Sequence, residues 1–172
     1  MSIHGVVPSL SPSMDIQVSS NFERLLFELL DRDATACARI MTEFRKTGVM
    51  KVADPVWDRA HALFHGVSLD DAATLAEIRT LNNRSHYLAD PHTAIGIAAG
   101  RAFREPGIPM VAMATAHPAK FPDAMAQATG IRPALPAVLA DLYDRPERYS
   151  VVPADLNMIE DRVRAAVMTN AG

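Results

Sequence analysis

The sequence predicts a mainly helical α/β chain whose one or two strands belong to an incomplete sheet. Apolar residues recur at helical spacing through most of the 172 residues, and prolines and capping residues mark successive helix starts. A single short apolar run without alternation, 110–114, is typical of a buried strand. One or two strands do not form a stable sheet. Either the chain is nearly all-helical with one orphan strand, or the remaining strands belong to another part of a larger protein.

The first part of the chain, residues 20–83, is predicted to be a helical subdomain. Ser19, Ser20 or Asn21 can cap the first helix, and Asp33 can cap the second, which stops at Gly48. Pro55 suits the first turn of the third helix, and the 68–71 segment resembles a capping box for the fourth. The expected helices span residues 20–30, 34–46 and 54–64, with a fourth that starts within 68–71 and ends near 82–83.

Residues 90–152 are predicted to form the α/β portion. Asp90 and Pro91 open a helix, 92–103, whose small side chains and two glycines suggest close approach to another element. The helix is followed by the strand at about 109–114, a helix at 122–129, a short helix at 136–142, a candidate second strand at 149–152 and a closing helix in 154–172. The chain therefore reads as a single partial domain, 1–172.

Composition and charge exclude several classes of protein. The 17 basic and 20 acidic residues are mixed along the chain, so no basic block indicates a nucleic-acid surface. No apolar run approaches the roughly 18 residues of a membrane span, and the N-terminus does not resemble a secretory signal. The single cysteine, Cys37, cannot form an internal disulfide and suits a reducing compartment. We therefore expect a cytoplasmic protein with neither nucleic-acid nor membrane partners.

Thr115 is the leading candidate for a binding residue. It follows the predicted strand 109–114, and ligands of open α/β sheets bind outside the carboxyl ends of the strands. The alternative is a strand-end threonine that ties down its own turn. A metal site from Asp58, His61 and His65, spaced i, i+3 and i+7, is also conceivable, but surface histidines explain that spacing better and we predict no metal.

Several separated blocks of the sequence are distinctive: SPSMDIQVSSNFERLL at 11–26, DPHTA at 90–94, ATAHPAKF at 114–121, FPDA at 121–124, RPALP at 132–136 and DLYDRPER at 141–148. Together these blocks resemble threonine synthase, an enzyme of the tryptophan-synthase-β-like fold type II that depends on pyridoxal phosphate (PLP). The resemblance covers about residues 6–152, loosely over 31–85, and concerns the C-terminal segment of that family. It implies that the predicted strands belong to an incomplete PLP-enzyme sheet.

The resemblance also implies an activity and a cofactor contact. The family converts O-phospho-L-homoserine and water to L-threonine and phosphate. The residue matching Thr115 hydrogen-bonds the pyridine nitrogen of PLP in that family, and His117 and Asn21 are secondary candidates for the surroundings. The family's Schiff-base lysine and glycine-rich phosphate loop lie earlier in its chain and have no counterpart here. Of the three lysines, only Lys120 lies in a block that resembles the family, and it matches a lysine that is not catalytic in that family. We therefore expect this chain alone to be inactive, with no catalytic residue and no bound PLP.

Two further interpretations stay open. The chain could be a stand-alone helical protein with an interaction or regulatory role and no catalysis, or it could be one half of a split enzyme. The expected partners are accordingly the missing N-terminal part or further copies of the chain, besides the phosphohomoserine substrate of the complete enzyme.

Overall fold

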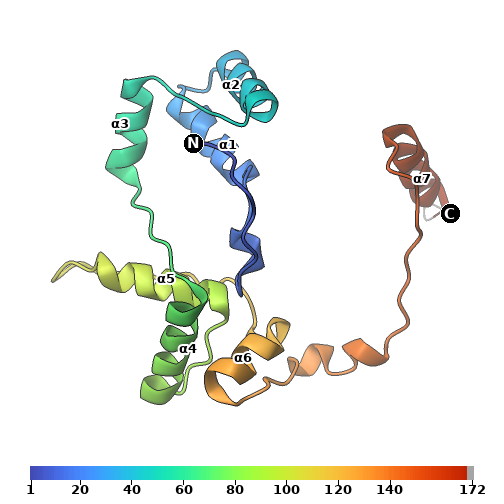
Figure 1. Ribbon diagram of the computed structural model, residues 1–172. Coiled ribbons are helices and arrows are strands. Elements are labelled where there is room, and N and C mark those ends of the chain that lie inside the picture. The colour runs from blue at the N-terminus through green and yellow to red at the C-terminus, as the bar shows by residue number, and fades with distance from the viewer. Residues whose placement is uncertain (170–172) are drawn as a thin grey trace. The chain divides into compact units, whose positions relative to one another are not determined.

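The structure is a computed structural model that describes residues 1–169 and divides into two compact units, Met1–Ala134 and a unit that begins at Leu135. The first unit contains α1 Ser20–Leu29, α2 Ala34–Thr47, α3 Asp54–Leu63, α4 Asp71–Ser85, α5 Pro91–Ala102 and α6 Pro122–Thr129, and the second contains α7 Leu156–Thr169 (Figure 1). Short 3-10 turns occur at Pro12–Met14, Pro118–Lys120, Ala137–Leu139 and Leu142–Asp144. Within the described residues, no helix is long and apolar enough to cross a membrane.

The predicted helices of the first unit are confirmed, and their ends follow the capping chemistry. Ser19 caps the start of α1, where its side chain accepts a hydrogen bond from the backbone N–H of Phe22. Asp33 caps α2 in the same way. Gly48 ends α2 with a φ of 71°, the left-handed conformation that glycine adopts without strain. The fourth helix begins later than the 68–71 pattern suggests, because the carboxylate of Asp70 caps it. The short helix predicted at 136–142 is replaced by two 3-10 turns.

The first unit contains two small cores. One joins α1 to α2, and the other joins α4 to α5 and α6 (Figure 1). The buried residues of the first are Leu26, Cys37, Met41, Phe44 and Met50, and those of the second are Ile78, Ala89, Ala94, Met125 and Ala128. Each core consists of buried apolar side chains, so each helical group has its own hydrophobic stabilisation.

The N-terminal segment lies against elements of both cores. Ser2 and Val49 form an isolated antiparallel bridge, beside which the N–H of Ile3 donates to the carbonyl of Gly48 at 2.7 Å. Farther along, the N–H of Leu10 donates to a carboxylate oxygen of Asp71 at 3.0 Å, at the start of α4. The segment after Leu10 is thereby held near α4 and α5.

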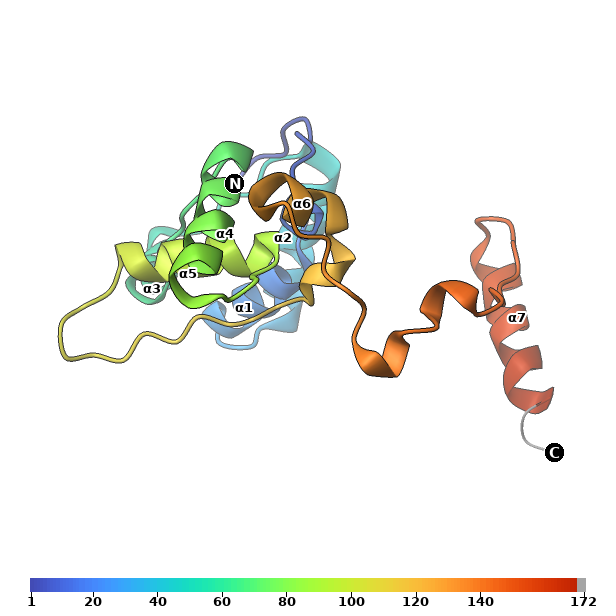
Figure 2. The same cartoon turned by 90° about the horizontal axis from the view of Figure 1, so that it is seen from below.

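The predicted strands at 109–114 and 149–152 are wrong, and with them the α/β fold class. The described residues 1–169 are helical, with strand-like pairing limited to the Ser2–Val49 bridge. A strand needs a neighbouring strand to receive its N–H and C=O groups, and residues 1–169 provide none beside either segment. Residues 103–117 instead form a long loop between α5 and the turn before α6 (Figure 2).

That loop keeps much of its apolar surface in solvent. Val111 and Met113 are 77% and 71% exposed. Met110 turns back onto α5, where its Cγ lies 3.2 Å from the position that a Cβ would take on Gly100. The absence of a side chain at Gly100 therefore allows the loop to approach the helix closely.

Candidate functional site

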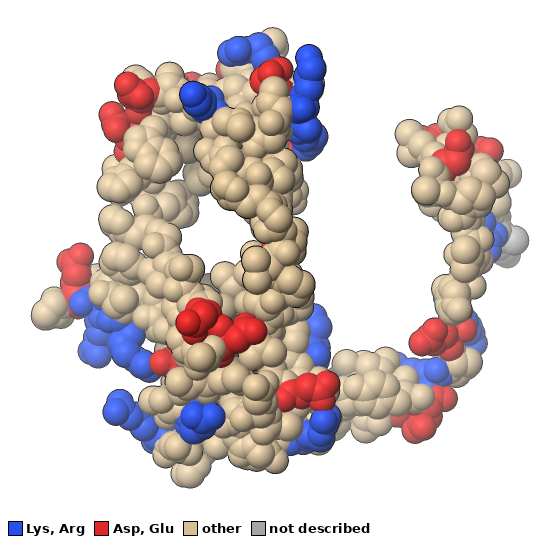
Figure 3. Space-filling view, viewed as in Figure 1, with Lys and Arg blue, Asp and Glu red and all other residues tan. Residues whose placement is uncertain are grey.

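A groove of about 1160 Å³ lies in the first unit, between the N-terminal segment, the residues after α3 and one face of α5. In Figure 3 an opening passes between these segments, and the atoms at its rim are mostly uncharged. The loop 110–116 and the pair Lys120 and Phe121 complete the lining. The α5 face carries His92, Ile95, Gly96, Ala99, Gly100 and Phe103. The groove is thus mainly apolar, with a few polar groups at its edge, as in many small-molecule sites.

The polar groups at this edge of the groove are connected by the buried carboxylate of Asp90. Asp90 is 1% exposed and precedes α5, where its Oδ1 accepts from the backbone N–H of His92 at 3.0 Å. The same oxygen accepts from Nδ1 of the His92 ring at 3.0 Å, and Oδ2 accepts from the hydroxyl of Thr93. A buried carboxylate is stable only when hydrogen bonds replace its hydration, and these three donors do so.

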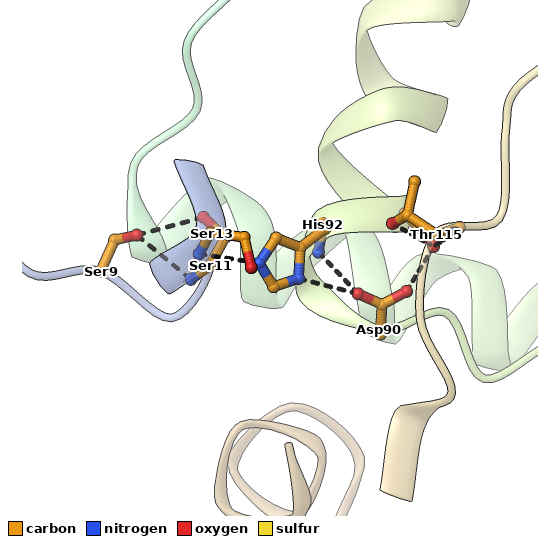
Figure 4. Close-up of polar contacts among 7 residues, drawn as sticks. Ser9, Ser11, Ser13, Asp90, His92 and Thr115 are labelled. Carbon is orange, nitrogen blue, oxygen red and sulfur yellow. Dashed lines mark hydrogen bonds and ion pairs between the residues drawn. The ribbon is translucent and has the colours of Figure 1, made fainter. Parts of the chain in front are cut away.

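The His92 ring connects Asp90 to the N-terminal segment. Its Nε2 accepts from the backbone N–H of Ser13 at 3.2 Å, so the proton of the neutral ring is on Nδ1, which donates to Asp90 (Figure 4). The ring also lies against Phe121, with centroids 4.9 Å apart. Both nitrogens are therefore occupied, and His92 serves as a tie between Ser13 and α5.

Thr93 connects Asp90 to Thr115 on the other side. Thr93 is 1% exposed, and its Oγ1 accepts from the backbone N–H of Thr115 at 3.0 Å while it donates to Asp90. The two threonine hydroxyls lie 3.4 Å apart. Thr115 itself is solvent-exposed and lines the groove, so its hydroxyl can exchange the long contact with Thr93 for a hydrogen bond to a bound molecule.

Known proteins resemble both the sequence and the backbone of this chain. The family model for the C-terminal domain of threonine synthase matches residues 93–163. The Pseudomonas aeruginosa threonine synthase is 48% identical over 155 residues, which cover 89% of this chain and 33% of that relative. The Corynebacterium glutamicum threonine synthase is 35% identical over 164 residues, covering 91% of this chain and 34% of that relative. The chain is homologous to the C-terminal part of threonine synthases.

Solved threonine synthases also match. The crystal structure of PLP-bound threonine synthase from Brucella melitensis superposes with a TM-score of 0.80 at 41% identity, over 95% of this chain and 35% of that chain. The yeast threonine synthase gives a TM-score of 0.75 at 26% identity. The chain thus spans about a third of the length of these threonine synthases.

The three predicted site residues lie in different places. Thr115 lines the groove, as expected of a residue that contacts a ligand. His117 is exposed and caps the 118–120 turn, where its Nδ1 accepts from the N–H of Ala119 at 3.1 Å, and it is not part of the groove lining. Asn21 is an exposed residue in the first turn of α1 and is also outside the lining. The ligand roles of all three stay predictions.

Asp90 and Thr93 are functional neighbours of Thr115 that were not predicted from the sequence. From the sequence Asp90 is recognisable only as a helix cap, and a separation of 22 positions hides the contact between Thr93 and Thr115. The one available signal was that both belong to the DPHTA block, 90–94, which matches threonine synthase.

The histidines considered for a metal site form a row of rings instead. The centroids of His61 and His65 are 5.9 Å apart, and His65 stacks on Phe103 at 5.0 Å with an interplanar angle of 16°. Among the residues that the structure describes, no group of three His, Cys, Asp or Glu could hold a metal ion. The row attaches the segment after α3 to the end of α5.

Proposed function

We propose that this chain supplies the C-terminal part of a threonine synthase, and that the groove is its share of the active site. The reaction would convert O-phospho-L-homoserine and water to L-threonine and phosphate. The observation that carries the proposal is the position of Thr115, whose exposed hydroxyl lies at the edge of the apolar groove in a chain homologous to these enzymes.

The groove, of about 1160 Å³, is large enough for a planar ring such as that of PLP. Its floor is open at Gly96, where a Cβ would meet no atom within 4 Å. The hydroxyl of Thr115 can donate to an unprotonated ring nitrogen, which is the contact that the family resemblance implies. PLP supplies the electron sink that reactions at amino-acid carbons require. The chain's own contribution is to hold the ring edge and to keep water from the apolar side of the groove.

Other parts of the reaction need residues from the rest of a threonine synthase, on a longer polypeptide or on a separate one. Of the three lysines, Lys120 lines the groove, and its Nζ lies 5.9 Å from the centroid of the Phe121 ring. Its place in the ATAHPAKF block matches the family's non-catalytic lysine. We therefore assign the covalent attachment of PLP and the binding of its phosphate to the rest of the enzyme.

Reassembly tests this proposal. The chain is mixed with a polypeptide carrying the remaining part of the Pseudomonas threonine synthase, and threonine and phosphate are measured from phosphohomoserine. We expect product only from the mixture, and a large loss with Thr115→Ala. Thr80→Ala is the matched control, because that hydroxyl only bonds the carbonyl of Ala76 within α4.

Two results would contradict the proposal. One is a reassembled protein that binds PLP but shows equal activity with Thr115→Ala and with the control. The other is threonine formation by this chain alone, with a borohydride-trapped PLP adduct on one of its own lysines.

The second candidate function is an interaction protein without catalysis. It is favoured by the two cores, which this chain builds from its own side chains. A chain that unfolds cooperatively as a monomer and gains no activity with the remaining part of a threonine synthase would support this candidate.

A further inference from the structure

The hydrogen bonds beneath Thr115 form a continuous connection from α5 to the groove edge. Asp90 begins it as a buried carboxylate, and Thr93 is the intermediate residue. The hydroxyl of Thr93 has one proton, which it donates in its hydrogen bond to the carboxylate of Asp90. A lone pair of Thr93 then remains to accept the backbone N–H of Thr115 at 3.0 Å. Each bond in this connection has a fixed donor and a fixed acceptor.

The loop that carries Thr115 has little else to hold it. Residues 107–115 are all exposed, and no strand partner receives their backbone groups within residues 1–169. Thr93, by contrast, is buried in the first turn of α5, where Asp90 fixes its rotamer. An exposed loop is thus held, at the residue that lines the groove, by a buried and hydrogen-bonded side chain.

We infer that Thr93 is a positioning residue for Thr115, and that Asp90 acts through Thr93 by orienting its hydroxyl. Only one part of this inference rests on the proposed function: the identity of the group that Thr115 contacts, a ring nitrogen in the groove. Preorganisation of this kind matters because a binding group that is already in place loses less freedom when the ligand arrives.

The connection also extends from Asp90 to the N-terminal segment, on the other side of Asp90 from Thr115 (Figure 4). The other oxygen of Asp90 accepts from Nδ1 of His92, whose Nε2 accepts from the backbone of Ser13. Ser13, His92 and Thr115 all line the groove. One buried carboxylate is therefore linked to groove-lining residues of the N-terminal segment and of the loop that carries Thr115.

Hydrogen exchange of the Thr115 amide tests the inference on the full chain without any ligand. Removing the acceptor with Thr93→Val should speed exchange at Thr115 about tenfold, the effect of losing one hydrogen bond. Thr93→Ser keeps the acceptor and should restore slow exchange. Thr93→Ala removes the same acceptor and replaces the valine variant if that variant does not fold. Unchanged exchange at Thr115 in a folded Thr93→Val or Thr93→Ala chain would overturn the inference.

The role of Asp90 is tested with a matched pair of variants. Asp90→Ala should speed exchange at Thr115, because the hydroxyl of Thr93 loses its orientation. Asp70→Ala removes only the cap of α4, through the bond from the N–H of Ala73, and should leave Thr115 unchanged. Equal acceleration by the two variants would show a general loss of helix capping and would overturn the assignment to Asp90.

A double-mutant cycle in the reassembled protein separates positioning from a structural role. PLP affinity, read from its visible absorbance, should fall about tenfold with Thr93→Val and should fall no further when Thr93→Val is added to Thr115→Val. Losses that multiply would overturn the positioning role. Failure of the reassembled wild-type protein to bind PLP would overturn the proposed function instead, and the exchange experiment would still decide whether Thr93 holds Thr115.

Discussion

Replacing Asp90 with alanine should destabilise the first unit far more than the loss of an ordinary helix cap. Asp90 is 1% exposed and accepts from the His92 backbone, the His92 ring and the Thr93 hydroxyl. Loss of the cap alone costs about 1 kcal/mol. The variant also leaves the buried hydroxyl of Thr93 without its acceptor, and an unsatisfied buried polar group costs about 1–3 kcal/mol. We therefore expect a total of about 3 kcal/mol.

Urea unfolding followed by circular dichroism measures this loss, with Asp70→Ala as the control. Asp70 is exposed, and its side-chain contact is the cap bond to Ala73 at 2.7 Å, so its loss should cost only about 1 kcal/mol. Equal destabilisation by the two variants would refute the reasoning, because it would mean that the bonds from His92 and Thr93 to Asp90 add nothing to its capping role.

Three further predictions concern other parts of the chain. Burial raises the pKa of the Cys37 thiol, so the folded chain should react slowly with thiol reagents at pH 8 and quickly in urea. The contribution of this thiol to folding stability is complete below the unfolded pKa of about 8.5. It is lost as the pH rises through the higher pKa of the folded chain. Gly96→Ala should raise the melting temperature, because a Cβ there meets no atom and alanine favours a helix by up to about 1 kcal/mol. Gly100→Ala should raise the melting temperature less and should speed proteolysis of the loop, because Met110 must move. The exposed apolar loop 108–114 should make the chain self-associate at micromolar concentration, as light scattering would show; a monomer under those conditions would contradict this expectation.

The sequence by itself determined where most of the helices of the first unit begin and end. Capping is a local effect: the Ser19 hydroxyl or the Asp33 carboxylate satisfies a free N–H two or three residues away, and Gly48 and Gly130 adopt positive φ without strain. These interactions lie within a few residues of one another, so their residue pattern is visible in the sequence. The family resemblance and the choice of Thr115 likewise came from short blocks of adjacent residues.

Only the tertiary structure decided what the segment 109–114 becomes and what surrounds Thr115. A strand is defined by hydrogen bonds to a neighbouring strand, and the described residues provide no such neighbour, so an apolar run that is typical of a strand remains a loop. The contact between Thr93 and Thr115 spans 22 residues and depends on how that loop returns to α5. Such contacts depend on the packing of distant segments, which local propensity does not specify.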